Sequence, residues 1–308
     1  MKVFTSIPDY PFENKSIVTI GTFDGVHLGH RVILKRMKEI AKKTKGKSVL
    51  LTFSPHPRHV LHKDNQDMKL ITTLQEKQDL INQAGLDNLV IHEFTKKFSR
   101  IKPVNFVRDI LVEQLNVHTL VIGYDHHFGR NREGSIQELT TLADLYDFNI
   151  EKIDPQYFED VTVSSSKIRK LIEKGEMVKA KQYLGYEFML NGKVIKGNSL
   201  GKTINFPTAN IVVENKWKIL PADGVYAVKI VLEAKEYKGM MNIGQKPTVD
   251  GNGISLEVNI FDFNQDIYGK GIEIRFVKRI RDERKFEDLQ ALKKQLLIDK
   301  NKALQILK

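Results

Sequence analysis

Two histidines in a glycine-rich segment are the residues of this chain best suited to chemistry. The segment Gly21-Thr-Phe-Asp-Gly-Val-His-Leu-Gly-His30 follows an apolar run and precedes a helical pattern. His27 and His30 therefore share one face at a helix start, where free backbone N–H groups favour phosphate, and Gly29 lets a ligand approach the backbone. Two imidazoles there could donate hydrogen bonds to phosphate oxygens that gain charge in a transfer reaction. An isolated HxxH would more readily be a metal-binding or chance pair, but its place after the first strand favours phosphate chemistry.

Two further segments of the first half could act on the same ligand. The serines Ser164–Ser166 precede a helical pattern, so hydroxyl and N–H groups could hold phosphate oxygens, and Arg169 could add a bidentate contact. Taken alone, this run is an ordinary helix N-cap. Asp125 follows the apolar run Thr119–Gly123 and could orient a substrate or a metal, although alone it would be a turn residue.

The second half contains a glycine-rich turn that falls short of a P-loop. Gly197-Asn-Ser-Leu-Gly-Lys-Thr203 has one residue too few between its first glycine and the Gly-Lys pair, and no helical pattern follows. A turn that holds phosphates by another geometry is still compatible with it. Farther on, alternation over Ile254–Ile260 places Ser255, Glu257 and Asn259 on one strand face, which sequence alone would assign to solvent.

The elements that must position these residues change character along the chain. The first half alternates strands and helices, which predicts βαβ units and a parallel sheet. Its expected strands and helices are Ser16–Phe23, Leu28–Ala41 (ended by Gly46), Ser48–Phe53, Leu74–Ala84 (closed by Gly85), Leu89–Phe94, a helix from Pro103, Thr119–Gly123, a helix capped by Ser135 and Asn149–Ile153.

After Gly185 the pattern becomes strand-rich, which predicts a barrel or sandwich. Two short helices lead up to the change, and a helix closes the chain. The expected elements are the helices Ser166–Lys174 and Glu176–Leu184, the strands Phe188–Lys196, Gly224–Leu232, Tyr237–Ile243, Ile254–Phe263 and Ile272–Val277, and the helix Phe286–Leu307. We place the domain boundary between residues 185 and 186.

Composition limits the classes of protein that fit. The 308 residues contain no cysteine, which excludes disulfides, cysteine-ligated metals and thiol catalysis. No apolar run reaches the length of a membrane span, and the N-terminus lacks the apolar stretch of a signal peptide, so we expect a soluble cytoplasmic protein. The net charge of +11 attracts anions without saying which.

The motifs of the first half resemble a known family. The segment from Gly21 to Arg31 resembles the HxGH signature of adenylyl- and cytidylyltransferases and, in its longer form, the N-terminal domain of bacterial bifunctional riboflavin kinase/FAD synthetases. Thr52–Pro57, Val121–Gly129 and Val163–Arg169 resemble further loops of that family. The resemblance implies a Rossmann-like domain with a parallel sheet that adenylylates FMN to FAD. It assigns catalysis to His27 and His30, ATP phosphates to Gly21, Phe23, Gly29, Ser165, Ser166 and Arg169, and the flavin side to Asp125 and Phe128.

The stretch Gly192–Asn210 resembles the riboflavin kinase domain, whose signature ends in GFPTAN. The resemblance implies an antiparallel barrel with a closing helix that phosphorylates riboflavin to FMN. In this sequence Lys202 and Asn205 replace the usual Arg and Gly, and Lys lacks the planar fork of Arg. The implied roles are Mg²⁺ binding with ATP by Thr208 and Asn210, phosphate binding by Gly197, Gly201 and Lys202, proton acceptance by Glu257, and flavin contact by Phe206, Asp223 and Tyr226.

Two alternatives are weighed against this interpretation. One is that a single activity is retained, with the other domain only binding flavin or acting on another substrate. The other is a basic nucleic-acid-binding protein, supported by the run Lys35–Lys47. No nucleic-acid-binding signature accompanies that run, so we interpret it as the solvated face of a helix. The expected ligands are riboflavin, FMN and ATP, with no nucleic-acid or membrane partner, and the oligomeric state is left open.

Overall fold

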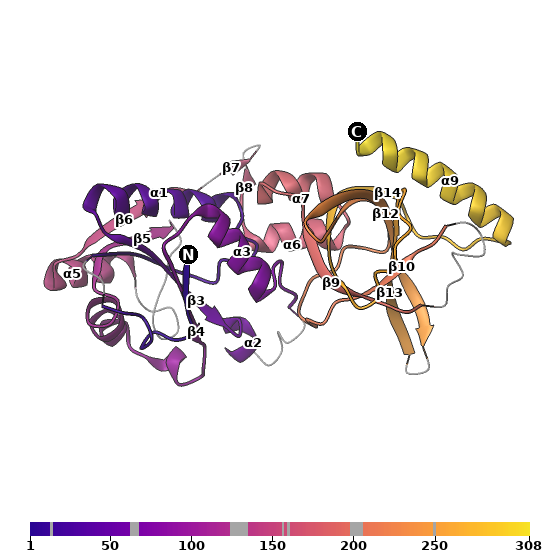
Figure 1. The fold of residues 1–308 in the computed structure, drawn as a ribbon. Coiled ribbons are helices and arrows are strands. Elements are labelled where there is room, and N and C mark those ends of the chain that lie inside the picture. The colour runs from indigo at the N-terminus through magenta and orange to yellow at the C-terminus, as the bar shows by residue number, and fades with distance from the viewer. Residues whose placement is uncertain are drawn as a thin grey trace. The chain divides into compact units, whose positions relative to one another are not determined.

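The chain forms two compact units, Met1–Ser165 and Ser166–Lys308, in the computed structural model. The structure describes residues 1–12, 15–61, 68–123, 135–155, 157–158, 161–197, 206–248 and 251–308. The first unit holds a six-stranded sheet with helices, and the second holds a closed barrel with helices (Figure 1).

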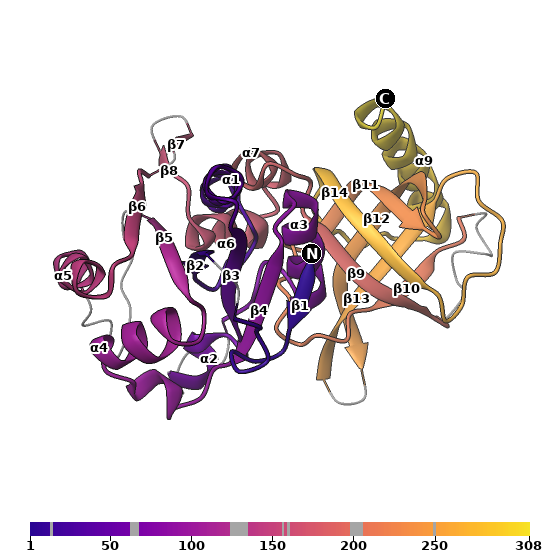
Figure 2. The same ribbon diagram turned by 60° about the vertical axis from the view of Figure 1, so that its left-hand side comes forward.

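The sheet of the first unit is parallel throughout, as the alternating pattern predicted. Its strands lie in the order β1-β4-β3-β2-β5-β6 (Figure 2). A short antiparallel pair, β7 (Tyr157–Phe158) and β8 (Val161–Thr162), lies outside it. The strands of the sheet are β1 (Lys2–Phe4), β2 (Ser16–Ile20), β3 (Lys47–Ser54), β4 (Asn88–Glu93), β5 (Val117–Gly123) and β6 (Asn149–Ile153).

Helices pack on the sheet because alternate strand residues are apolar on both faces. On one face, Val18 and Leu120 pack with the helical segment after Pro103 and with α5 (Ile136–Tyr146). The neighbouring strand residues point to the other face, and α1 (Leu28–Thr44) contacts β2, β3 and β5 through its own buried stripe. The remaining elements of this unit are α2 (Pro57–Leu61), α3 (Leu74–Ala84), η2 (Phe98–Arg100), α4 (Pro103–Asn105) and the π-helical η3 (Phe106–Val112).

The strand order places the histidine segment at a reversal of the sheet. The chain moves from β2 through β3 to β4 on one side, and β5 then lies on the other side of β2. Ligands of open α/β sheets bind at such a reversal, beyond the carboxyl ends of the strands. The loop Gly21–His27 leaves β2 at that point, so the topology itself makes this edge a candidate site.

One helix end differs from its prediction. The helix α1 ends at Thr44, and Lys45, not Gly46, adopts the left-handed conformation with φ 55°. Gly46 is needed for a different reason, because a Cβ there would lie 2.4 Å from the Lys15 carbonyl oxygen. The predicted ending of α3 is confirmed, since Gly85 has φ 76° and caps the helix.

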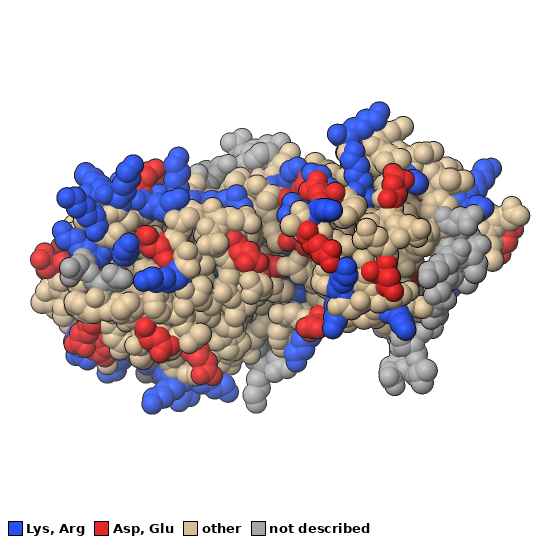
Figure 3. All heavy atoms as spheres, in the orientation of Figure 1, with Lys and Arg blue, Asp and Glu red and all other residues tan. Residues whose placement is uncertain are grey.

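The basic run Lys35–Lys47 lies mostly on the exposed side of α1. Lysines and arginines gather along this helix in Figure 3, while Leu34, Met37 and Ala41 face the core. Arg36 pairs with Glu39 and Glu151, so part of the charge is already neutralised within the unit. The run therefore has the amphipathic placement of an ordinary surface helix.

The second unit is an antiparallel barrel closed in the order β10-β13-β12-β11-β14-β9. Every neighbouring pair is antiparallel, and β9 pairs with both β14 and β10. The strand β10 follows the glycine-rich turn and was not predicted. The strands are β9 (Met189–Ile195), β10 (Ala209–Val212), β11 (Gly224–Leu232), β12 (Lys235–Thr248), β13 (Gly251–Ile260) and β14 (Gly271–Arg281).

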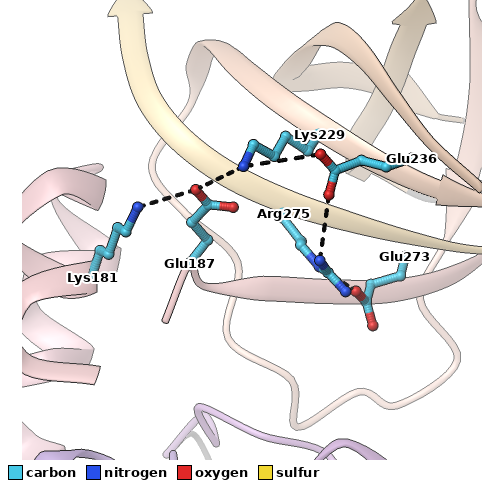
Figure 4. Close-up of polar contacts among 6 residues, drawn as sticks. All are labelled: Lys181, Glu187, Lys229, Glu236, Glu273 and Arg275. Atoms are coloured by element: carbon cyan, nitrogen blue, oxygen red, sulfur yellow. Dashed lines mark hydrogen bonds and ion pairs between the residues drawn. The ribbon is translucent and has the colours of Figure 1, made fainter. Parts of the chain in front are cut away.

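Two helices precede the barrel strands in the second unit, α6 (Ser165–Glu173) and α7 (Met177–Leu184). A line of ion pairs joins α7 to the barrel wall (Figure 4). Glu187 meets Lys181 at 3.2 Å and Lys229 at 3.4 Å, and Glu236 continues the line to Arg275 at 3.5 Å. Such partly exposed pairs stabilise weakly one by one, but together they tie α7 to strands β11, β12 and β14.

The closing helix α9 (Leu289–Ile306) is held to the barrel by a buried ion pair. Asp299 is fully buried and accepts from Arg281 Nε of β14 at 2.9 Å and from Gln295 Nε2 at 2.7 Å. Ala303 and Leu307 also pack against the barrel core and add apolar contacts. The helix was predicted from Phe286, and it begins later because the Asp288 side chain caps it.

Replacing Asp299 by Ala is expected to destabilise the barrel by about 3 kcal/mol, because Arg281 keeps a mostly buried charge without its carboxylate. Urea unfolding followed by a barrel-specific signal measures the change. Lys300→Ala is the matched control on the same helix, since its pair with the exposed Asp262 is 4.0 Å long and should contribute less than about 1 kcal/mol. Equal unfolding midpoints for Asp299→Ala and the unaltered chain would show that the Asp299–Arg281 ion pair does not stabilise the barrel.

Candidate functional sites

The loop between β2 and α1 has an unusual backbone that the surrounding residues hold in place. Phe23, Gly25 and Val26 have positive φ values of 48°, 83° and 37°. The buried Asp24 carboxylate accepts from the N–H groups of Ile71 and Thr72 at 2.9 and 3.0 Å. A left-handed backbone at a β-branched residue is costly, so this loop depends on those anchors for its shape.

The loop stacks three rings at the start of α1. The rings of His27 and His30 are 3.7 Å apart with 15° between their planes, and Phe23 stacks on His30 at 4.5 Å. A Cβ at Gly29 would lie 3.3 Å from the His27 ring, and one at Gly21 would lie 3.0 Å from the Phe23 ring. Gly21 and Gly29, two of the predicted site residues, therefore leave space for the Phe23 and His27 rings.

His27 is the N-cap of α1, and its Nδ1 accepts from the His30 N–H at 3.4 Å. When the ring is neutral, this bond leaves its proton on Nε2. His30 Nδ1 is buried and has no hydrogen-bond partner within the described part of the chain. Burial, with the charges of His27 and Lys77, holds the pKa of His30 well below its usual value. His30 is therefore a neutral imidazole at neutral pH, and its one N–H proton can be donated to an anion.

Sequence reasoning missed Lys77, a buried lysine of α3 at this site. Its Nζ donates to the Thr22 carbonyl at 3.0 Å and to Thr52 Oγ1 at 3.2 Å. Burial lowers the pKa of Lys77 to about 8, and the Asp24 carboxylate opposes that shift. Lys77 lies far from the histidines in the chain and carries no motif of its own, so the only available signal was a lysine at a position of the α3 pattern that faces the core.

The predicted serine run meets the same loop through one residue. Ser165 begins α6, and its hydroxyl donates to the Asp24 carbonyl at 2.9 Å. Ser166 and Arg169 follow in α6. Asp125 and Phe128 lie outside the described residues.

The barrel brings a second group of predicted residues together. Glu257 on β13 accepts from Thr208 Oγ1 at 3.2 Å and from Ser255 Oγ at 3.0 Å. Asn259, on the same strand face, is buried and donates to the Pro207 carbonyl at 2.7 Å. The sequence alone favoured a solvated face here; the structure buries Asn259 and leaves Ser255 and Glu257 partly exposed, with Pro207 and Thr208 hydrogen-bonded to this face.

Asn210 lies directly opposite Glu257 in the pairing of β10 with β13. Its side chain also packs against Gly197, where a Cβ would lie only 2.0 Å from Asn210 Nδ2. Thr208, Asn210, Glu257 and Gly197 thus meet at one end of β10. Gly201 and Lys202 lie outside the described residues.

Replacing Gly197 by Ala is expected to displace the Asn210 side chain, because the added methyl group would overlap its amide. A displacement of about 1 Å can cost on the order of 10²-fold in rate, so reactions at this end of the barrel should slow by about that factor. Gly271→Ala is the matched control, since a Cβ there meets nothing within 4 Å. Steady-state rates of riboflavin phosphorylation, the reaction that the family resemblance implies for the barrel, test the prediction. Equal rates in the two variants would show that Asn210 takes no part in the site.

A pocket of about 460 Å³ lies beside this group, between the end of β13 and α9. Phe206, Ile260 and Leu297 give it apolar walls, and Lys293, Lys300 and Asp262 are its charged residues. Phe206 also packs into the barrel core, with 7% of its surface exposed. The volume of this pocket lies within the range of small-molecule sites, about 300–1,000 Å³.

Two predicted flavin residues lie away from that pocket. Tyr226 is fully buried with its ring edge-on to Phe276, and its hydroxyl donates to the Ala222 carbonyl. Burial raises the pKa of Tyr226 to about 12. Asp223 accepts from Gln245 Nε2 at 3.0 Å near the start of β11. Neither residue lines the pocket.

The two units, each with its own polar site, are typical of a two-domain transferase. Residues 10–167 match the FAD synthetase family, and residues 184–307 match the riboflavin kinase family. The chain belongs to the family of bifunctional riboflavin kinase/FMN adenylyltransferases. This confirms the family resemblance and the predicted fold class.

Three similar proteins illustrate the match. The bifunctional riboflavin kinase/FMN adenylyltransferase of Bacillus subtilis is 39% identical, over 94% of this chain and 92% of that protein. The Escherichia coli K12 protein of the same description is 35% identical, over 92% and 90%. A crystal structure from Streptococcus pneumoniae, described as a macrolide-efflux protein, is 30% identical with a TM-score of 0.89 and covers 97% of both chains.

Among the helices that the structure describes, none combines the length and the apolar character needed to cross a membrane.

Proposed function

We propose that this chain carries both activities of its family. The barrel transfers the γ-phosphoryl group of ATP to riboflavin, which yields FMN and ADP. The N-terminal unit joins the AMP part of ATP to FMN, which yields FAD and pyrophosphate. The observation that carries the proposal is the presence of two separate polar groups, the stacked histidines at the end of β2 and the Thr208–Glu257 pair in the barrel, each in a unit that matches one of the two families.

For adenylyl transfer, we assign His27 and His30 to the ATP phosphates. A phosphate oxygen of FMN attacks the α-phosphorus, and the bond to the bridging oxygen of pyrophosphate breaks. Negative charge grows on that leaving group, where N–H donors of two imidazoles and the start of α1 stabilise it. Ser165, Ser166 and Arg169 are proposed to bind the same phosphates, and Asp125 and Phe128 to lie on the flavin side.

For the kinase reaction, we assign Glu257 as the base. The terminal ribityl hydroxyl of riboflavin attacks the γ-phosphorus of ATP and loses its proton, which a nearby carboxylate can accept. The hydrogen bonds from Thr208 and Ser255 fix the two carboxylate oxygens in place. The pocket beside Phe206 is proposed to hold the isoalloxazine ring against its apolar walls.

The barrel group also suits Mg²⁺ bound with ATP. Thr208 and Asn210 offer a hydroxyl and an amide oxygen beside the Glu257 carboxylate, and hard oxygen donors are what Mg²⁺ prefers. Within the described residues no three acidic or histidine side chains converge, so phosphate oxygens and water would complete the coordination. When bound, Mg²⁺ neutralises phosphate charge; Gly197, Gly201 and Lys202 are proposed to hold the phosphates themselves.

We also propose that the functional boundary lies between residues 185 and 186. The FAD synthetase match ends at residue 167, and the riboflavin kinase match begins at residue 184, close to that position. The internal contacts instead divide after Ser165, so α6 and α7 fold with the barrel unit. Limited proteolysis of the full chain tests which division separates stable fragments.

The proposed function is tested by supplying each substrate separately. With riboflavin and MgATP, chromatography should show FMN first and FAD later. With FMN and MgATP, it should show FAD and pyrophosphate. Absence of FAD in the second reaction would contradict the assignment of the N-terminal unit, and absence of FMN in the first would contradict that of the barrel.

A further inference from the structure

The adenylyl-transfer site contains a buried charge that the proposed chemistry does not use. Lys77 is 8% exposed and comes from α3, an element separate from the loop and helix that carry the histidines. Burying an ammonium group costs free energy unless it gains partners. Its charge still reaches His30, whose pKa it lowers. Because burial of this ammonium group costs free energy and the group lies beside the proposed phosphate site, we expect Lys77 to have a functional role.

The contacts of Lys77 show what it holds. Its ammonium group donates to the Thr22 carbonyl and to Thr52 Oγ1, and the Thr52 hydroxyl also donates to the Thr22 carbonyl at 3.3 Å. Thr22 is the residue before the left-handed Phe23, which carries the ring that stacks on His30. Lys77 therefore fixes the end of β3 and the start of the histidine loop to each other.

We propose that Lys77 is a positioning residue for adenylyl transfer, holding the histidine loop through Thr22 and Thr52 and adding a fixed positive charge beneath the ATP phosphates. The inference rests on the proposed function of this unit. It adds a residue from outside the HxGH segment to the site. Because a charge in a water-poor site acts strongly on nearby anions, Lys77 should favour both ATP binding and departure of pyrophosphate.

The variants Lys77→Gln and Lys77→Met separate the two parts of this role. Gln keeps a hydrogen-bond donor without the charge, and Met removes both. In either variant the Thr22 carbonyl still accepts from Thr52, so the loop keeps one anchor. Lys43→Met, at an exposed position of α1, is the matched control.

We expect kcat/KM for ATP in FAD formation to fall at least tenfold in both variants, with Met falling further. Riboflavin phosphorylation by the barrel should stay within twofold, which shows that the chain is folded. Thermal unfolding should occur at nearly the same temperature, because removal of a buried charge offsets the loss of its two hydrogen bonds. Lys43→Met should change none of these quantities.

The pH profile distinguishes this role from a purely structural one. Lys77 interacts electrostatically with Asp24 of the histidine loop and with His30 of α1. In the unaltered protein, kcat/KM for FAD formation should fall as pH rises past about 8, where Lys77 loses its proton. This alkaline fall should be absent in both variants.

Three outcomes would overturn the proposal. They are FAD formation within twofold of the unaltered protein, an unchanged alkaline fall in the variants, or a loss of FAD formation that follows only from a lower unfolding temperature. The unaltered protein is assayed first with FMN and MgATP. If it forms no FAD, the proposed function fails, and the role of Lys77 fails with it for that separate reason.

Discussion

Replacing His27 by Asn is expected to reduce FAD formation from FMN by about 10²–10³-fold, the usual effect of removing one donor to a developing oxyanion. Asn is a good N-cap residue, so α1 should still begin at Leu28 while the imidazole donor is lost. Phosphorylation of riboflavin should stay within twofold. Product chromatography with each substrate supplied separately measures both rates.

The control for His27→Asn is His118→Asn. His118 is a partly buried histidine of β5 that contacts the Thr119 hydroxyl and has no place in the proposed site. It should leave both reactions unchanged. If the His27→Asn variant formed FAD at more than about a tenth of the rate of the unaltered protein, the stacked histidines would not be the groups that stabilise pyrophosphate.

Replacing Glu257 by Gln is expected to reduce FMN formation by about 10²–10⁴-fold, the range for removal of a positioned base. Gln has nearly the same size and can still accept a hydrogen bond from Thr208 or Ser255, so the strand should keep its pairing. Conversion of FMN to FAD should remain within twofold. Rates of ADP release with riboflavin and of FAD formation with FMN measure the two effects.

Ser255→Ala is the comparison for Glu257→Gln. It removes one of the two hydrogen bonds to the carboxylate and leaves the base itself, so its loss of FMN formation should be much smaller. Equal losses in the two variants would mean that the hydrogen-bonded group, and not the carboxylate as a base, limits the reaction.

Much of the fold could be predicted because the apolar periods of this sequence are clear. The strands β2, β5 and β6 and the helix α3 follow from runs that end at glycine or aspartate, and β3 and β4 follow from their apolar residues. The strand β10 could not be predicted, since its four residues overlap the Thr208–Asn210 motif and only pairing with β9 and β13 makes them a strand. The strand β1 is likewise short and depends on pairing with β4.

The site could be predicted where its chemistry is local in the sequence. The spacing of His27 and His30 and their place after β2 indicated one face at a helix start, and their stacked rings agree with that prediction. The alternation around Glu257 gave its strand face, but only the structure shows that Thr208 and Ser255 donate to its carboxylate and that Asn259 donates to the Pro207 carbonyl. Lys77 could not be predicted, because its contacts join three distant parts of the chain.

The central claim is that two independent sites act in succession, with FMN passing between them. The most direct test mixes His27→Asn with Glu257→Gln in the presence of riboflavin and MgATP. Each variant alone should form almost no FAD, and the mixture should form it, because the first makes FMN and the second adenylylates it. A mixture that forms no FAD, although Glu257→Gln converts added FMN, would contradict the account, as would FAD formation from riboflavin by either variant alone.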